Sequence, residues 1–191
     1  MIKAVMFDCF GVIRTDSLFG AYSSLGGDPE ADFDFIVAAT DAVSKGTLET
    51  SVPTFAQRLG VSEEAWIRAN EERSIIDHEV LAYVKELRGR YKTALLTNIG
   101  KGGIKRFFDE GFLEEFFDVV VASAEIGYAK PEAQAYEITA ERLGVRLDEC
   151  VFIDDRQPYI DGAAAVGMQT LLFTGLPDLK VQLERLLSDP R

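Results

Sequence analysis

The chain has 191 residues, a formal net charge of −12 and a hydrophobic fraction of 47%. This length allows one domain with a substantial core, or one domain that contains a smaller insert. The negative charge argues against a broad nucleic-acid interface, and no apolar stretch is long enough to span a membrane. Because no signal-like segment begins the chain, we expect a cytoplasmic protein with neither nucleic-acid nor membrane partners.

An apolar run near the N-terminus predicts the first strand of a buried parallel sheet. The run Ala4–Phe7 ends in Asp8, and Gly11 follows shortly after it. Such a run delivers a carboxylate to the carboxyl edge of the sheet, where open α/β proteins bind their ligands. A lone aspartate at this place is more often a turn former, and Phe10 stands where a second carboxylate could have been its partner.

The segment between Arg14 and about Tyr83 has a different character. Its apolar residues recur at helical spacing within polar sequence, which predicts a helical insert. Ser62 is expected to cap one of these helices. The only histidine, His78, lies near a predicted helix start and is expected to be a surface or capping residue. We therefore divide the chain into a core of residues 1–13 and 84–191 and an insert of residues 14–83.

The rest of the chain alternates strand-like and helical runs, which predicts an α/β fold with helices on both faces of a parallel sheet. The remaining strands are expected at Thr93–Thr97, Val119–Ala122, Val151–Ile153 and Thr170–Phe173. Helices are expected at Ile104–Phe108, Leu113–Phe117, Ala133–Leu143 and Ile160–Val166, and from Pro177 onward. Cys9 and Cys150 are too few for a disulfide framework and are expected to be reduced core thiols.

Two later segments place polar groups where a phosphate could bind. Thr97 and Asn98 end a predicted strand before a glycine-rich helix start, where free N–H groups suit an oxyanion; both could instead simply cap that helix. Lys130 precedes Pro131, which restricts it to extended geometry. Its ammonium could neutralise a phosphoryl oxygen or keep a nearby carboxylate ionised.

A third segment ends a predicted strand with the adjacent carboxylates Asp154 and Asp155. Like charges at this spacing repel one another unless a cation lies near them. Hard oxygen ligands beside phosphate chemistry indicate Mg²⁺. The alternative is structural, with Asp155 as the N-cap of the following helix.

Taken together and in this order, the motifs resemble those of the haloacid dehalogenase-like (HAD) superfamily of hydrolases. The motifs are Asp8-Cys9-Phe10-Gly11-Val12, Leu96-Thr97-Asn98, Lys130-Pro131 and Phe152-Ile153-Asp154-Asp155-Arg156. The resemblance extends over nearly the whole chain, most loosely in the insert, where Gly46-Thr47-Leu48 is similar to a recurrent cap junction. It implies a Rossmann-like core with a small helical cap inserted after the first motif.

The resemblance also implies roles for individual residues. Asp8 would attack phosphorus and form an aspartyl-phosphate. Thr97 and Lys130 would bind the transferring phosphoryl group, and Asn98 would orient the phosphate or the lysine. Mg²⁺ would be held by Asp8, the carbonyl of Phe10, Asp154 and Asp155. The implied substrate is a small phosphorylated metabolite.

Phe10 is the departure from this pattern, because most family phosphatases place an aspartate there to protonate the leaving oxygen and later activate water. Losing such a group typically costs about 100- to 10,000-fold in rate. The favoured interpretation is a Mg²⁺-dependent phosphatase with a weakened or substituted acid step. A non-catalytic phosphate- or partner-binding relative is the second interpretation.

The third interpretation is a 2-haloacid dehalogenase, a branch that resembles this chain in having an aromatic residue at the Phe10 position. Arg14 would then hold the substrate carboxylate, but the adjacent pair Asp154 and Asp155 argues against a reaction that needs no metal. In this family the cap selects the substrate, and Arg14, Tyr22 and Lys45 are candidates for facing the cleft. The sequence is compatible with a monomer or a homodimer.

Overall fold

The computed structural model describes residues 1–188 and contains one five-stranded parallel sheet in the order β3-β2-β1-β4-β5. The predicted α/β class with a Rossmann-like sheet is therefore confirmed. Each strand begins and ends within one residue of the predicted bounds. The strands are β1 (Ala4–Phe7), β2 (Lys92–Thr97), β3 (Val119–Ala122), β4 (Cys150–Asp154) and β5 (Gln169–Leu172).

The central strand β1 brings the carboxyl ends of three strands together. Phe7 is in register with Leu95 of β2 and with Ile153 of β4, and all three side chains are fully buried. The next residue, Asp8, remains tied to this sheet because its N–H donates to the carbonyl of Ile153 at 2.9 Å. The polar residues that follow β1, β2 and β4 therefore meet at one edge.

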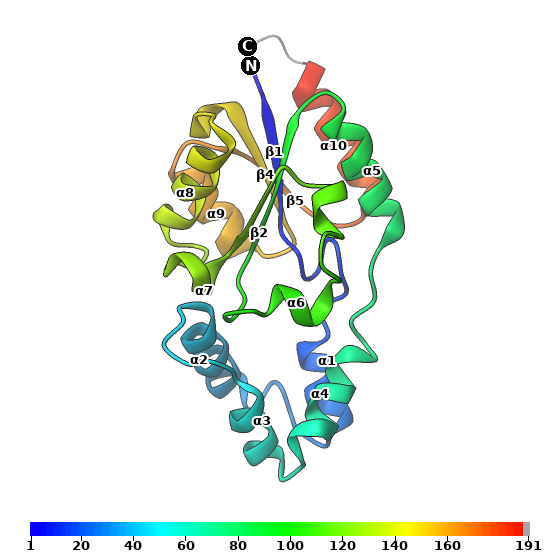
Figure 1. The fold of residues 1–191 in the computed structure, drawn as a ribbon, viewed down its shortest axis with the longest axis vertical. Helices are drawn as coiled ribbons and strands as arrows, with labels where there is room; N and C mark the ends of the chain where they lie inside the picture. The colour runs from blue at the N-terminus through cyan, green and yellow to red at the C-terminus, as the bar shows by residue number, and fades with distance from the viewer. Residues whose placement is uncertain (189–191) are drawn as a thin grey trace.

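Helices cover both faces of the sheet (Figure 1). One face packs against α5 (His78–Arg88), α10 (Leu176–Ser188) and the aromatic segment that begins with α6 (Ile104–Phe107). The other face packs against α8 (Ala133–Leu143) and α9 (Gln157–Ala165), with α7 (Ser123–Ile126) directly after β3. The apolar residues of these helices and of the alternate strand positions form two separate clusters, one on each face.

The helix expected over residues 113–117 is shorter than predicted. The structure has a single 3₁₀ turn, η1 (Leu113–Glu115), in its place. Phe117 instead turns inward, where it is 3% exposed and meets the ring of Phe7 edge-on at a centroid distance of 6.3 Å. Burial of this ring against the sheet ends the helical turn early.

Four helices of the insert form a second layer, which lies beyond the carboxyl ends of the strands (Figure 1). They are α1 (Leu18–Ser24), α2 (Phe33–Ser44), α3 (Val52–Leu59) and α4 (Glu63–Glu71). They share their own apolar cluster, in which Tyr22, Phe55 and Trp66 are packed ring against ring. The predicted cap at Ser62 is confirmed, since its hydroxyl accepts from the N–H of Ala65 at 3.2 Å.

The expected insert boundary at residue 83 lies within α5. Val80, Leu81 and Tyr83 belong to the same apolar cluster as β1, so the whole of α5 packs with the sheet. Asp77 caps this helix by accepting from the N–H of Val80 at 3.0 Å, and His78 is exposed. We therefore propose that the chain re-enters the core at Asp77.

Cys9 and Cys150 are buried and unpaired, as expected for core thiols. Burial raises the pKa of the Cys150 thiol to about 12. Among residues 1–188, no helix combines the length and the apolar character needed to cross a bilayer.

Candidate active site

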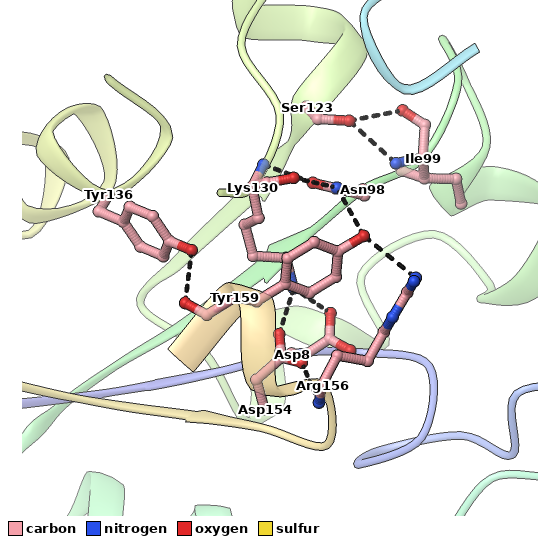
Figure 2. A network of polar contacts seen from close by, with 9 residues as sticks. All are labelled: Asp8, Asn98, Ile99, Ser123, Lys130, Tyr136, Asp154, Arg156 and Tyr159. Carbon is pink, nitrogen blue, oxygen red and sulfur yellow. Dashed lines mark hydrogen bonds and ion pairs between the residues drawn. The ribbon is translucent and has the colours of Figure 1, made fainter. Parts of the chain in front are cut away.

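Lys130 lies at the centre of a buried charged cluster at the carboxyl edge of the sheet (Figure 2). Its ammonium donates to Asp8 Oδ1 at 2.5 Å and to Asp154 Oδ2 at 2.7 Å. The side chains of Lys130 and Asp154 are fully buried, and that of Asp8 is 7% exposed. Residues far apart in the sequence thus form one bridged unit: Asp8 follows β1, Asp154 ends β4, and Lys130 lies between α7 and α8.

The cluster contains more negative than positive charge. Burial raises the pKa of Asp8 to about 7, against the opposing effect of the Lys130 ammonium, and the nearby Asp154 adds to the rise. Burial also raises the pKa of Asp155, with a further contribution from Asp154. Although burial disfavours the charged form of Lys130, the carboxylates of Asp8 and Asp154 raise its pKa overall. A single ammonium therefore compensates only part of the carboxylate charge, which favours an additional cation.

The carboxylates are placed so that they could hold such a cation. One oxygen from each of Asp8, Asp154 and Asp155 lies within 4.8 Å of the others. Asp155 Oδ1 is buried and has no hydrogen-bond partner in the part of the chain that the structure describes. A set of hard carboxylate oxygens with an unsatisfied member suits Mg²⁺. The carbonyl of Phe10 stays a predicted fourth ligand.

Gly11 is required for this arrangement. Its backbone has φ +96°, and a Cβ added here would lie 2.3 Å from Asp155 Oδ2. Only glycine combines this conformation with so close an approach. The alternative role of Asp155 as a helix cap is not observed: α9 has Arg156 at its N-cap, and the N–H of Arg156 donates to Asp154 Oδ1 at 2.9 Å.

Asn98 positions the lysine instead of capping a helix. Its side-chain Nδ2 donates to the carbonyl of Lys130 at 2.8 Å, and its Oδ1 accepts from the N–H of Lys130 at 2.9 Å. The helix that follows, α6, begins after Gly103, which offers it no side-chain cap. The amide therefore fixes the backbone from which the ammonium extends toward the carboxylates.

Thr97 supplies a hydroxyl with no protein partner. The residue is fully buried at the end of β2 and lines a cavity, and its Oγ1 makes no hydrogen bond within residues 1–188. A buried hydroxyl without a hydrogen-bond partner lowers the stability of the fold unless a ligand forms a hydrogen bond with it. This hydroxyl is a ready donor to an oxyanion bound beside Lys130.

Replacing Thr97 by valine is expected to weaken phosphate binding about 10-fold, the loss of one hydrogen bond to a charged group, without loss of stability. Thr93→Val is the matched control, because Thr93 is an equally buried threonine of β2 whose hydroxyl donates to the carbonyl of Phe116 at 2.7 Å. It should lower the melting temperature and leave phosphate inhibition unchanged. The two variants are compared by their inhibition constants for inorganic phosphate and by their thermal melts. Equal inhibition constants for Thr97→Val and wild type would contradict a role of the Thr97 hydroxyl in phosphate binding.

The cluster opens into a cavity of about 440 Å³ between the core and the insert helices. Its core wall includes Asp8, Phe10, Thr97, Asn98 and Lys130, so the structure brings these predicted residues to one cavity. Its roof comes from the insert and mixes apolar and polar side chains. The roof residues are Asp16, Ser17, Leu18, Val37, Thr40, Asp41, Val43, Ser44, Ser51 and Asn70.

A larger concavity of about 710 Å³ lies at the opposite, amino end of the strands, beside Lys3, Arg88 and Lys92. It contains none of the predicted site residues. Two of its cations already have partners, Lys3 with Glu149 at 2.7 Å and Arg88 with Asp118 at 3.0 Å. The candidate active site is therefore the smaller cavity.

The expectation that Arg14, Tyr22 and Lys45 face the cleft is wrong for all three, since none lines the cavity. Tyr22 is fully buried in the insert, where its hydroxyl donates to Asp32 Oδ2 at 2.7 Å. Lys45 is exposed and pairs with Asp41 at 3.1 Å. Spacing along the sequence placed these residues in the insert but could not show which way each one points.

The guanidinium of Arg14 connects the insert to the core through hydrogen bonds and ring contacts. Its guanidinium donates to Ser74 Oγ at 3.0 Å and to the carbonyl of Phe107 at 2.7 Å. It also lies over the rings of Phe107 and Phe108, at 5.5 and 5.1 Å from their centroids. Arg14 does not line the cavity, so its guanidinium is not placed to bind a substrate there.

Tyr159 is a site residue that the sequence did not indicate. Its ring lies 4.9 Å from the ammonium of Lys130, and its hydroxyl accepts from Arg156 Nη1 at 3.1 Å (Figure 2). Its carbonyl accepts from the hydroxyl of Tyr136 at 2.7 Å. Ser123 was also missed; its hydroxyl accepts from the N–H of Ile99 at 3.0 Å and so fixes the loop after β2. Neither residue belongs to a recognisable local pattern.

A parallel sheet whose strand ends hold a lysine-bridged pair of aspartates beneath a helical roof defines a class of α/β enzymes with an active site between core and cap. Residues 2–167 match the family model of haloacid dehalogenase-like hydrolases, and the chain belongs to this family of enzymes. The resemblance inferred from the motifs is thereby confirmed.

Individual relatives agree with this assignment. The chain is 43% identical over 60 residues to phosphatase MT3486 of Mycobacterium tuberculosis, which is 31% of this chain and 28% of that protein. It is 30% identical over 132 residues to the ribulose-1,5-bisphosphate 5-phosphatase of Halopiger xanaduensis, 66% of this chain and 53% of that protein. The chain thus spans about half or less of the length of these curated relatives.

Among solved structures, a HAD family enzyme from Bacteroides thetaiotaomicron in complex with magnesium and inorganic phosphate has the same fold, with a TM-score of 0.72. The match covers 90% of this chain and 94% of that chain at 22% identity.

Proposed function

We propose that the protein is a Mg²⁺-dependent phosphatase that hydrolyses a small phosphorylated metabolite through an aspartyl-phosphate at Asp8. The observation that carries this proposal is the buried cluster in which Lys130 bridges Asp8 and Asp154 beside two unsatisfied polar atoms, Thr97 Oγ1 and Asp155 Oδ1. The names of the two relatives, and the magnesium and phosphate bound by the Bacteroides enzyme, support it.

The free oxygen of Asp8 is the proposed nucleophile. Lys130 binds Oδ1, no hydrogen bond within residues 1–188 engages Oδ2, and the carboxylate lines the cavity. The ammonium of Lys130 and the hydroxyl of Thr97 would bind phosphoryl oxygens on the same side. Mg²⁺, held by Asp8, the Phe10 carbonyl, Asp154 and Asp155, would neutralise charge on the transferring group.

Phe10 leaves the usual proton donor missing. Its ring lines the cavity and packs edge-on against Phe107 at a centroid distance of 5.1 Å, so this position supplies no proton. A sugar 1-phosphate or an acyl phosphate would need less protonation of its leaving group than a simple alkyl phosphate. The missing acid also motivates the second candidate function, a non-catalytic phosphate- or partner-binding protein.

The dehalogenase alternative loses support. Arg14, its candidate for the substrate carboxylate, is committed to Ser74 and Phe107. The unsatisfied oxygen of Asp155 has no use in a reaction that needs no metal. Cytoplasmic location, the absence of nucleic-acid and membrane partners, and a monomeric or homodimeric state stay predictions.

The proposal is tested by hydrolysis of para-nitrophenyl phosphate and acetyl phosphate in Mg²⁺ or in EDTA. Turnover is expected only with Mg²⁺, which should also raise the melting temperature, because a ligand that binds only the folded state stabilises it. A protein whose rate and melting temperature do not respond to Mg²⁺ would contradict the proposal. Phosphate binding without turnover would instead support the non-catalytic candidate, and chloride release from 2-chloropropionate would restore the dehalogenase.

A further inference from the structure

The proposed reaction leaves one proton without a source. In phosphoryl transfer the attacking and leaving oxygens lie roughly in line. Because Asp8 attacks from the core side, the leaving oxygen must face the cavity roof that the insert provides. A group that protonates it therefore has to come from the roof, and this inference rests on the proposed function.

Among residues 1–188, two carboxylates besides Asp8 line the cavity, Asp16 and Asp41. Asp41 already has a cationic partner, Lys45, at 3.1 Å. The ring of Tyr159 lies over the Lys130 ammonium, and its hydroxyl accepts from Asn98 Nδ2 at 3.4 Å and from Arg156 Nη1 at 3.1 Å, which places it on the phosphoryl side. The remaining carboxylate of the roof is Asp16.

Asp16 lies on the segment that joins the core to α1. Its Oδ1 accepts from the N–H of Leu18 at 3.1 Å, which fixes the carboxyl group at the helix start. Its Oδ2 has no hydrogen bond or ion pair within the described residues, and the residue is exposed at the cavity. When Asp16 is ionised it contributes to the raised pKa of Asp155, so Asp16 is close enough to interact with the charged cluster across the cavity.

We propose that Asp16 supplies the proton that Phe10 cannot. As Asp8 Oδ2 bonds to phosphorus, the bond from phosphorus to the leaving oxygen breaks, and that oxygen takes the proton of the Asp16 carboxyl group. In the second half, the Asp16 carboxylate takes a proton from water while the water oxygen bonds to phosphorus. The bond from phosphorus to Asp8 breaks, phosphate leaves, and both aspartates return to their starting forms.

The test compares Asp16→Asn with wild type on two substrates in Mg²⁺. With β-glycerophosphate, whose alkoxide needs a proton, kcat/KM should fall about 100-fold, the lower range for a general acid. With para-nitrophenyl phosphate, whose phenolate leaves unprotonated, the loss should be small. Asparagine keeps the oxygen that accepts from the N–H of Leu18, so the melting temperature should not change.

Two further variants show that the effect belongs to proton transfer. Asp41→Asn, the matched change at the other roof carboxylate, should alter kcat/KM for both substrates by the same factor. Adding Phe10→Asp to Asp16→Asn should restore much of the β-glycerophosphate rate. Equal losses on both substrates, or no loss on either, would overturn the role of Asp16 while leaving the phosphatase intact. A wild type inactive on both would contradict the proposed function and this inference with it.

Discussion

Asp8→Asn is expected to lower kcat for phosphatase turnover by about 10⁴-fold or more, as removal of a covalent nucleophile typically does. The asparagine side chain has the same shape, and Lys130 keeps its partner Asp154 at 2.7 Å. Steady-state assays with para-nitrophenyl phosphate and Mg²⁺ measure the loss. A variant rate within a few-fold of wild type would mean that the activity comes from a contaminant or from another nucleophile.

The same substitution should leave the fold as stable as wild type, or more stable, when EDTA is present. Burial raises the pKa of Asp8 from 3.8 to about 7, so the folded chain binds a proton here more tightly than the unfolded chain does. The contribution of Asp8 to the free energy of unfolding of wild type is therefore greatest below about pH 4. This contribution falls as the pH rises from about 4 to 7. Asparagine has no such dependence, so the advantage of the variant should grow over this range.

Thermal melts of both proteins at several pH values test this expectation. Asp109→Asn is a suitable control, because Asp109 is exposed and does not line the cavity. It should change neither turnover nor the pH dependence of stability. If Asp8→Asn instead melts much lower than wild type at every pH, then its loss of activity would reflect unfolding and would not identify a nucleophile.

The sheet could be predicted closely because buried parallel strands are nearly continuous apolar runs. Ala4–Phe7 and Val119–Ala122 have the predicted bounds, and both stand out in the sequence without any tertiary information. The turn at Leu113–Glu115 is shorter than the predicted helix because Phe117, which follows it, faces the sheet instead of continuing a helix. Periodicity identifies apolar positions, but it does not separate a helix from a loop that packs.

The core half of the site could also be predicted, because its residues follow strand ends in order. Asp8, Thr97 and Asp154 lie at the carboxyl ends of three neighbouring strands, as the sheet topology requires. The roof could not be predicted, because which insert residues face the cavity depends on how α1 and α2 pack over it. Arg14 shows the difficulty most clearly: its position beyond the first motif suggests substrate binding, whereas its actual contacts are Ser74 and Phe107.

Lys130→Met is the substitution expected to cost the most stability. It removes the ammonium that bridges Asp8 and Asp154, and both carboxylates are almost fully buried. Breaking a buried ion pair by removing one partner typically costs about 3–5 kcal/mol, because the other charge is left unpaired. Chemical denaturation in EDTA measures the loss. Lys101→Met, at an exposed lysine, is the control and should be nearly neutral.

The double variant Asp8→Asn/Lys130→Met tests whether charge, and not packing, causes this loss. Removing the Asp8 carboxylate should return part of the stability, because one unpaired buried charge then remains in place of two. Contacting residues are expected to be non-additive in this way. Mg²⁺ should stabilise Lys130→Met more than wild type, since the metal then replaces the positive charge that the ammonium supplied to the aspartates. Additive losses, together with an unchanged response to Mg²⁺, would instead show that Lys130 stabilises the site through the packing of its methylene chain.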